Sequence, residues 1–358
     1  MAVLMAKTED HVYLQKALVV AELRKGFCAP NPSVGAVIVK DNIIVATGHH
    51  EAAGHVHAEI AALEKLNYKA DKATLYVTLE PCCHWGKTPP CTDAIIQSGI
   101  KRVVYAYKDP NPIVAGKGEA ILLNAGLQCD HLPLSEINTF YKSYTHWHQA
   151  QTPFVTAKIA MTLDGKIAGK QSNPLQITGE ALKELTHQYR KKSDAILTTS
   201  KTITQDNPQL NVRFPAETLS KPLYILDSQL NLPLTAKVFS TAKSLIIFHA
   251  KSAPSDRLNQ LLERGVRCYS VAETVDGLNL LDILVQIGKD GVHDLWVEAG
   301  AKCFSAFVQQ KLLHRILIYM APWVAGEGSF AFHMPVDFRA YPLHWQQFGK
   351  DVLCEIDC

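Results

Sequence analysis

The sequence predicts a protein of two α/β domains in tandem. Its 358 residues are long for a single domain, and a length-based estimate gives about two. Helix-like and strand-like segments alternate through both halves, which is typical of layered folds with a largely parallel sheet. A second cycle of this alternation begins after a polar helical segment that ends near Gln151. We therefore expect domains at residues 1–151 and 152–358, without a long linker between them.

In the first half, apolar residues at helical spacing alternate with short β-branched runs. The first two β-branched runs are split by Asp41-Asn42, a pair that favours a hairpin turn. The predicted strands are 34–39, 43–46, 75–79 and 103–107. The predicted helices are 11–23, 57–66, 92–98, 118–125 and 135–149.

In the second half, Thr152-Pro153 precedes a β-branched strand and the alternation repeats. The predicted strands are 154–159, 195–198, 223–226, 244–248 and 295–297. The predicted helices are 180–191, 256–264 and 278–287. Neither half contains an internal repeat or a low-complexity segment, so we expect two ordinary globular domains.

Charge and cysteine content narrow the functional class. Lys and Arg number 36 against 34 Asp and Glu, so the net charge of +2 indicates neither a nucleic-acid partner nor a membrane surface. No segment is typical of a signal peptide, and the apolar run 316–324 is too short to span a membrane. Nine cysteines without a signal sequence indicate a reducing compartment, where close cysteines bind metal or stay free. We expect a cytoplasmic protein.

The strongest motif is a His-x-Glu, followed downstream by a Pro-Cys pair and a further cysteine. This arrangement is the signature of zinc-dependent nucleobase deaminases. A catalytic zinc takes three protein ligands and leaves a fourth position for water, and His57, Cys82 and Cys91 supply three. Each motif lies where a strand or loop enters a predicted helix. Glu59 follows His57 by two residues and points elsewhere on a helix, so we expect it to transfer protons to and from the reacting water.

Longer segments of the first half carry a more specific resemblance. They are 31–37 (NPSVGAV), 48–50 (GHH), 57–59 (HAE), 78–91 (TLEPCCHWGKTPPC), 109–112 (DPNP) and 116–118 (GKG). Together they resemble the deaminase half of the bifunctional deaminase–reductase family of riboflavin biosynthesis. The resemblance implies a phosphorylated small-molecule substrate, 2,5-diamino-6-(5-phosphoribosylamino)pyrimidin-4(3H)-one, which is hydrolysed at C2 to the uracil derivative and ammonia.

The resemblance also implies which side chains of this half hold the substrate. Asn31 offers a donor and an acceptor to the edge of the pyrimidine, and the alternative is a turn residue before Pro32. Other residues supply donors or positive charge for the ribose hydroxyls and the phosphate. They are His50, His84, Lys87, Asn111 and Lys117. For the two lysines, simple solvated charge is the alternative.

Segments 158–166, 202–213 and 298–300 resemble the reductase half of the same family. The resemblance implies a cytidine-deaminase-like three-layer α/β/α domain followed by a dihydrofolate-reductase-like α/β domain that binds NADPH. No G-x-G-x-x-G follows a predicted strand, so the cofactor would not be held by the usual dinucleotide fingerprint. The implied reaction reduces the ribosyl side chain of 5-amino-6-(5-phosphoribosylamino)uracil to a ribityl group.

The resemblance implies two sets of site residues in this half. The cofactor contacts are Ala160, Thr202, Asp206, Ser228 and Gly300, and the substrate contacts are Lys158, Arg190, Leu210, Arg213 and Glu298. Arg190 and Arg213 suit a phosphate, because a guanidinium binds it with two parallel hydrogen bonds. Asp206 and Glu298 suit sugar hydroxyls or proton transfer. The alternatives are a plain turn at Asp206, a solvated charge at Arg190 and a surface carboxylate at Glu298.

Two residues depart from the family pattern before the first helix of the second half. Gln176 stands where the family usually has Trp, and Pro174 replaces Ser. The loss of an aromatic wall predicts weaker cofactor binding or a rearranged loop. Family similarity further implies a homo-oligomer, a dimer or a tetramer.

Two other functions remain as alternatives. One is a different zinc deaminase, acting on cytidine or a tRNA base, with a degenerate reductase domain; a tRNA enzyme would favour a basic face, and it would leave the second half unexplained. The other is a binding module with a structural zinc, which would be closed by a fourth ligand such as Cys83 or His84.

Overall fold

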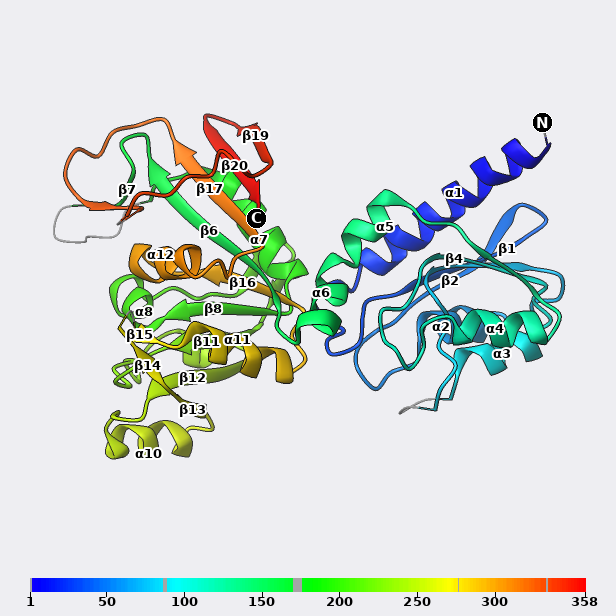
Figure 1. Ribbon diagram of the computed structural model, residues 1–358, viewed down its shortest axis with the longest axis horizontal. Helices are drawn as coiled ribbons and strands as arrows, with labels where there is room; N and C mark the ends of the chain where they lie inside the picture. The colour runs from blue at the N-terminus through cyan, green and yellow to red at the C-terminus, as the bar shows by residue number, and fades with distance from the viewer. Residues whose placement is uncertain (1, 86–88, 170–175, 276, 333) are drawn as a thin grey trace. The chain divides into compact units, whose positions relative to one another are not determined.

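The computed structural model describes residues 2–85, 89–169, 176–275, 277–332 and 334–358 (Figure 1). The chain divides into two compact units, unit 1 at Met1–Gln151 and unit 2 at Thr152–Cys358. Each unit has its own sheet, helices and hydrophobic core.

Unit 1 is built on a five-stranded mixed sheet of order β2-β1-β3-β4-β5. The strands are β1 Gly35–Lys40, β2 Ile43–His49, β3 Thr74–Leu79, β4 Arg102–Tyr107 and β5 Gln128–His131. β1 runs antiparallel to β2 and β3, whereas β3, β4 and β5 run parallel to one another. The predicted hairpin is confirmed: Asp41 and Asn42 join β1 to β2 with φ of 50° and 61°, the positive values that a type I′ turn requires.

Helices cover both faces of this sheet (Figure 1). They are α1 Ala2–Glu22, α2 Ala58–Glu64, α3 Cys91–Gln97, α4 Lys117–Asn124, α5 Ser135–Phe140 and α6 Lys142–Ala150. Side chains alternate along a strand, so Ala36 and Ile38 of β1 pack with α2, α3 and α4. Val37 and Val39 point the other way and pack with α1, α5 and α6. Unit 1 is therefore a three-layer α/β/α domain.

The prediction of one helix over 135–149 was wrong, because α5 and α6 are separated at Tyr141. The backbone there has φ −93° and ψ 4°, outside helical geometry. Its side chain is fully buried, and its hydroxyl donates to the carbonyl of Ser33 at 3.0 Å and lies 2.7 Å from Thr78 Oγ1. Burial of this ring with its hydroxyl hydrogen-bonded favours the break, and nothing in the polar local sequence signals it.

Unit 2 is built on a nine-stranded sheet of order β13-β12-β11-β8-β16-β6-β17-β20-β19. In that order the strands are Arg267–Val271, Ser244–Ala250, Pro222–Leu226, Ala195–Thr199, Asp294–Glu298, Phe154–Thr162, Arg315–Ala321, Asp351–Asp357 and Leu343–Phe348. The strands from β13 to β17 are parallel, whereas β20 is antiparallel to both β17 and β19. The sequence predicted five of the parallel strands and none of the antiparallel extension.

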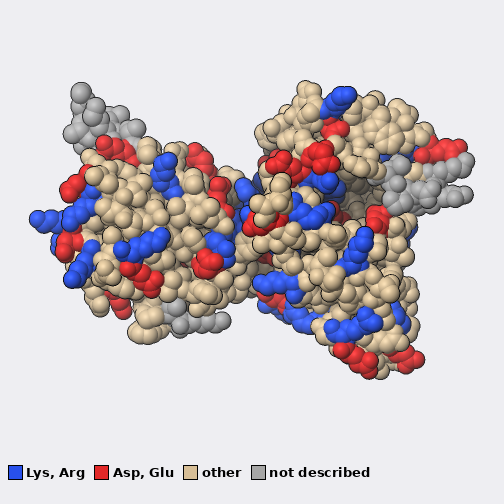
Figure 2. Space-filling model, turned by 180° about the vertical axis from the view of Figure 1, so that it is seen from behind, with Lys and Arg blue, Asp and Glu red and all other residues tan. Residues whose placement is uncertain are grey.

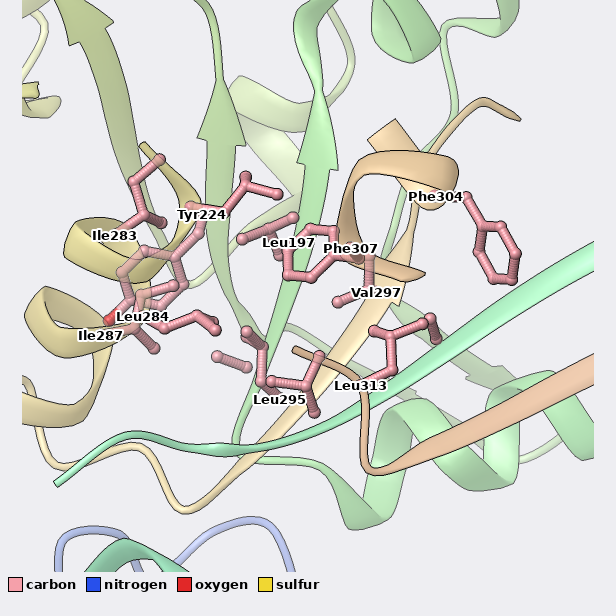
Figure 3. Packing of buried hydrophobic residues seen from close by; sticks show 14 of the residues in the cluster. Leu197, Tyr224, Ile283, Leu284, Ile287, Leu295, Val297, Phe304, Phe307 and Leu313 are labelled. Atoms are coloured by element: carbon pink, nitrogen blue, oxygen red, sulfur yellow. The ribbon is translucent and has the colours of Figure 1, made fainter. Parts of the chain in front are cut away.

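Two hydrophobic clusters flank the central strands of unit 2. Its helices are α7 Glu180–Lys192, α8 Ser200–Asp206, α9 Val238–Thr241, α10 Ser255–Glu263, α11 Leu280–Lys289 and α12 Ala301–Gln309. Figure 3 shows the cluster on the α11 and α12 side, where Phe307 lies beside Val297 of β16 and Ile283 lies near Tyr224 of β11. Trp296 lies in the cluster on the other face, with residues of α7, α8 and α10. Short two-stranded ribbons complete the unit: β7 Lys166–Ala168 with β18 Ser329–Phe330, β9 Val212–Phe214 with β10 Glu217–Leu219, and β14 Glu273–Thr274 with β15 Gly277–Leu278.

The charges on the surface and the lengths of the helices both bear on possible partners of the chain. Acidic and basic side chains are interspersed over the face shown in Figure 2. Every helix within the described ranges is too short or too polar to cross a membrane.

A buried ion pair fastens α1 to the sheet of unit 1. Arg102 of β4 donates from Nη1 and Nη2 to the two carboxylate oxygens of Asp10, both at 2.8 Å, and the Tyr76 hydroxyl donates to Asp10 Oδ1 at 2.7 Å. The Asp10 side chain is only 7% exposed. Burial alone would raise its pKa, but the bonds from Arg102 and Tyr76 prevail and hold it below the usual 3.8.

We expect Asp10→Asn to lower the free energy of unfolding of unit 1 by about 2–3 kcal/mol at neutral pH, because it leaves a partly buried guanidinium short of its partner. Since the folded-state pKa of Asp10 is depressed, its stabilisation is present above about pH 4 and disappears as the pH falls through the folded value, so the difference between the variants narrows there. Hydrogen exchange of α1 and β4 peptides in a urea series at several pH values measures both effects. Asp130→Asn removes the more exposed partner of Arg102 and costs less than about 1 kcal/mol; equal losses in the two variants would contradict the prediction.

Candidate active sites

Three metal-ligating side chains converge in unit 1. His57 Nδ1 lies 3.4 Å from Cys82 Sγ and 3.3 Å from Cys91 Sγ, and the three ligand atoms lie within 4.8 Å of one another. Within the described part of the chain, neither Cys83 nor His84 joins this group. Three nitrogen and sulfur donors without a fourth protein ligand suit a catalytic zinc, which keeps one position for water.

The elements place these ligands as the sequence predicted. His57 is the N-terminal cap of α2, and Cys91 is the first residue of α3. Cys82 follows β3, and its Sγ accepts a hydrogen bond from the Cys91 backbone N–H at 3.3 Å. Hydrogen bonding from Cys91 lowers the pKa of the Cys82 thiol, although burial opposes the shift. The thiolate form that a metal requires is therefore favoured.

Glu59 lies beside the ligand group but is not a member of it. Its side chain is buried, and burial, followed by the charge of Cys82, raises its pKa to about 7. A carboxyl group with this pKa exchanges protons readily near neutral pH, as a general acid and base must. Glu59, His57 and Cys82 all line one cavity of about 260 Å³.

The same cavity collects most of the residues that the sequence assigned to the deaminase substrate. Asn31, His50, His84 and Asn111 all line it. Val56 accepts a hydrogen bond at its carbonyl from His50 Nδ1 at 2.9 Å, so His50 Nε2 accepts from Asn31 Nδ2 at 3.1 Å. Burial lowers the pKa of His50, which keeps the ring neutral for this arrangement. The amide of Asn31 is thereby held in one orientation at the cavity wall.

The structure describes one of the two lysines assigned to the phosphate. Lys87 lies outside the described residues. Lys117 does not line the cavity, and its ammonium donates to the carbonyls of Pro112 and Ile113 at 3.2 and 3.1 Å. The charge of Lys117 is thus directed at its own loop.

The glycines that flank Lys117 have a packing role. The Glu80 carboxylate accepts the backbone N–H groups of Gly116 at 3.0 Å and Gly118 at 3.1 Å, so it caps the start of α4. Gly116 has φ 73°, a conformation that glycine favours. A Cβ at Gly118 would lie 2.1 Å from the carbonyl oxygen of Pro81. This motif therefore joins α4 to the loop that carries Cys82, a candidate metal ligand.

Two further cavity residues were missed from the sequence. Asp109 is 7% exposed, and its Oδ1 accepts the Asn111 N–H at 2.9 Å and the Tyr144 hydroxyl at 3.3 Å. Burial raises the pKa of Asp109 to about 6. Asp109 was noted only within the DPNP segment of the family resemblance and received no role, and Tyr144 belongs to α6, which carries no motif. Both offer polar groups to a ligand in the cavity.

Unit 2 contains a buried ion pair at the end of β16. Arg190 of α7 donates from Nε to Glu298 Oε1 at 2.5 Å and from Nη2 to Oε2 at 2.9 Å. The two side chains are 10% and 13% exposed, so the alternatives of a solvated arginine and a surface carboxylate are wrong. Burial would raise the pKa of Glu298, but Arg190 and Lys158 outweigh it and lower the pKa to about 2. Lys158 of β6 lies opposite Glu298 in the parallel register of β6 and β16.

The remaining substrate positions of unit 2 extend this network. Arg190 Nη1 donates to the carbonyl of Asn211 at 2.9 Å, and Arg213 Nη1 donates to the Asn211 side-chain oxygen. The Arg213 backbone N–H donates to Nδ1 of His187 at 3.2 Å. Leu210 is 2% exposed and packs in the cluster on the α7 side, so its side chain belongs to the core.

A cavity of about 350 Å³ in unit 2 gathers part of the expected cofactor set. Thr202, Ser228 and Gly300 line it, whereas Ala160 and Asp206 are absent from its described lining. A Cβ at Gly300, the N-terminal cap of α12, would meet no atom within 4 Å, so packing alone does not require glycine there. An open backbone at a helix start suits the close approach of a phosphate.

Sequence reasoning missed the positive charge of this cavity. Lys201 and Lys302 line it, and its described lining holds no carboxylate. This charge suits a phosphorylated cofactor.

Of the two departures noted in the sequence, Gln176 is exposed and Pro174 lies outside the described residues. Beside Gln176, the carbonyl of Ile177 accepts the indole N–H of Trp323 at 3.1 Å.

Comparisons with known proteins cover nearly the whole chain. A family model described as the RibD C-terminal domain matches residues 153–354, and one described as the cytidine and deoxycytidylate deaminase zinc-binding region matches residues 7–107. The riboflavin biosynthesis protein RibD of Aquifex aeolicus is 40% identical over 328 residues, 90% of either chain.

Two solved structures are similar throughout. Acinetobacter baumannii RibD has a TM-score of 0.87 at 32% identity and covers 98% of this chain and 99% of its own. A diaminohydroxyphosphoribosylaminopyrimidine deaminase/5-amino-6-(5-phosphoribosylamino)uracil reductase from Thermotoga maritima has a TM-score of 0.86 at 31% identity, with the same coverage.

We expect Cys82→Ser and Cys91→Ser each to weaken zinc binding by more than about 100-fold, because a three-ligand site loses one thiolate. Cys83→Ser is the matched control, since it changes the adjacent cysteine that lies outside the ligand group, and it retains about one zinc per chain. Elemental analysis and competition with a chelator measure the two effects. Loss of zinc from Cys83→Ser would show that the site is closed by a fourth ligand.

Proposed function

Because this chain belongs to the RibD family of bifunctional riboflavin-biosynthesis enzymes, we propose that its two reactions are divided between units 1 and 2. The chain is a zinc-dependent deaminase and an NADPH-dependent reductase, and the family, fold class and cofactors expected from the sequence are confirmed. We assign the deaminase to residues 1–151 and the reductase to residues 152–358. The three-ligand group with Glu59 buried beside it is the observation that carries the first assignment.

In the deaminase, water replaces the 2-amino group of 2,5-diamino-6-(5-phosphoribosylamino)pyrimidin-4(3H)-one. We assign the metal to His57, Cys82 and Cys91, and a bound zinc ion supplies Lewis-acid activation of the attacking water. Glu59 takes one proton from this water and delivers it to the ring nitrogen, and it then carries the second proton, from the hydroxyl added at C2, to the amino group, which leaves as ammonia. Its pKa of about 7 suits both transfers.

Polar groups around the deaminase cavity orient the substrate. Asn31 receives the pyrimidine edge, because His50 fixes its amide. His84 and Asn111 face the ribose and phosphate from the same cavity. Lys87 and Lys117 are assigned to the phosphate on family resemblance, and Lys117 must first release its two loop carbonyls.

In the reductase, the ribosylamino group of 5-amino-6-(5-phosphoribosylamino)uracil becomes a ribitylamino group. When bound, NADPH would supply a hydride for the sugar C1 carbon of the opened, imine form of the substrate, whose nitrogen gains a proton. We assign Thr202, Ser228 and Gly300 to the cofactor, supported by their common cavity, and Ala160 and Asp206 by resemblance.

The substrate of the reductase is assigned to the network at the end of β16. Lys158 and Glu298 contact the opened sugar chain and steer its protons, which their cross-strand pairing supports. Arg190 and Arg213 complete this side of the site, whereas Leu210 is assigned to the substrate by family resemblance alone, since its side chain lies in the core. Arg213 is the better phosphate ligand, since the guanidinium of Arg190 already binds Glu298 and Asn211.

The setting of the enzyme follows the family. We infer a cytoplasmic homo-oligomer, a dimer or a tetramer, that acts on small molecules without a nucleic-acid partner. The interspersed charges of Figure 2 support the last inference.

Glu59→Gln tests the proton-transfer role. We expect deamination to fall by about 10²–10⁴-fold while zinc content is unchanged, because the amide cannot exchange the proton. Reduction of the already deaminated pyrimidine should proceed at the wild-type rate. Glu64→Gln, an exposed change on the same helix, is the control. Loss of both reactions in Glu59→Gln would contradict the division between units.

The order of the two reactions is tested with zinc-loaded protein and the diaminopyrimidine substrate, with and without NADPH. We expect ammonia release in both cases, and NADPH consumption only after deamination. Ammonia and NADPH absorbance are followed together. Deamination without NADPH consumption would refute the reductase assignment, and absence of ammonia would refute the deaminase assignment.

A further inference from the structure

Trp296 is buried beside the carboxylate of Glu298, and we propose that it is a positioning residue for the reduction. Trp296 lies two residues before Glu298 on β16, so both side chains leave the same face of the strand. It is fully buried and stacks on Tyr189 of α7 with ring centroids 5.0 Å apart and planes 14° apart. The proposal rests on the assignment of Glu298 to the reductase site.

The indole N–H of Trp296 is bonded to the carboxylate itself. Trp296 Nε1 donates to Glu298 Oε1 at 2.7 Å, the oxygen that also accepts Arg190 Nε at 2.5 Å. The second oxygen, Oε2, accepts Arg190 Nη2 at 2.9 Å. Three N–H groups from two rigid planar side chains therefore fix the position and rotation of the carboxylate plane.

The fixed carboxylate faces an ionisable partner. Lys158 lies beside Glu298 in the register of β6 and β16, and its ammonium lies 5.4 Å from the ring centroid of Tyr319. Burial lowers the pKa of Lys158, and the charge of Glu298 counters that shift. The orientation of Glu298 thus determines the distance and angle at which its charge meets Lys158.

Trp296 has no other polar task. Its ring fills the cluster on the α7 side, a role that any large apolar ring would serve. The N–H donor distinguishes tryptophan from phenylalanine, and Glu298 receives it. A hydrogen bond to a charged, buried acceptor is among the stronger ones in proteins. Without the hydrogen bond from Trp296, the Glu298 carboxylate can rotate relative to the guanidinium of Arg190.

The experiment compares Trp296→Phe with the wild-type full-length chain in NADPH-dependent reduction of the deaminated pyrimidine. We expect kcat to fall about tenfold, with the KM for NADPH within about twofold of wild type. Deamination by the same preparation should be unchanged. Trp345→Phe, on the exposed edge strand β19, makes the same chemical change away from the site and should leave all rates unchanged.

A double-mutant comparison separates positioning from packing. If Trp296 acts through Glu298, then Trp296→Phe in a Glu298→Ala background changes the residual rate by less than about twofold. If it acts only by packing, the loss is the same in both backgrounds, and the proposal is overturned.

A second variant guards against a folding defect. Replacement of Trp296 by β-(3-benzothienyl)alanine keeps the bicyclic ring and removes only the N–H donor, and it should reproduce the fall in kcat. Wild-type kcat in this variant overturns the proposal. Absence of reduction by the wild-type chain would instead refute the reductase assignment of Glu298, and the proposal with it.

Discussion

Both candidate sites depend on one constraint, the direction in which parallel strands end. Strands β3 and β4 of unit 1 run parallel, so the segments after them, which carry Cys82 and Asp109, emerge at the same edge of the sheet. Strands β8, β11 and β16 do the same in unit 2, and Thr202, Ser228 and Gly300 follow them. Ligand sites in open α/β sheets form at such edges. The reaction chemistry differs between the units, but the way each fold gathers its residues does not.

The sequence predicted the parts of the molecule that depend on local spacing. The candidate metal ligands could be proposed because they form a recognisable signature, and Glu59 could be set apart from them because residues two apart on a helix point in different directions. Tyr144 and the α5–α6 break at Tyr141 were missed, because tertiary hydrogen bonds place them and no short motif reports these. The strand β20 was missed for a related reason, because its partner β17 is distant in the sequence. The strand β19 pairs only with β20 and is exposed along most of its length, so it lacks the apolar pattern of a buried strand.

Arg190 and Glu298 were each given an alternative interpretation as a solvent-exposed charge, and both alternatives were wrong because the two charges are buried together. A lone Arg190 near a helix end is usually solvated, and a lone Glu298 at a strand end is usually exposed. They are distant in sequence, so only the packing of α7 against β16 shows that each satisfies the other. The same physics joins Asp10 to Arg102 in unit 1. Buried opposite charges are found in pairs because either alone would be expensive to desolvate.

The contact between Gly118 and Pro81 limits how the deaminase half can diverge. There is no room for a β-carbon at position 118, and Glu80 holds the same turn through its carboxylate. A side chain at this position would displace the backbone next to Cys82, so a substitution in the first turn of α4, which holds no candidate metal ligand, would change metal affinity first. Homologues that replace Gly118 should therefore also have rebuilt the segment around the first cysteine, and the two segments should be inherited together.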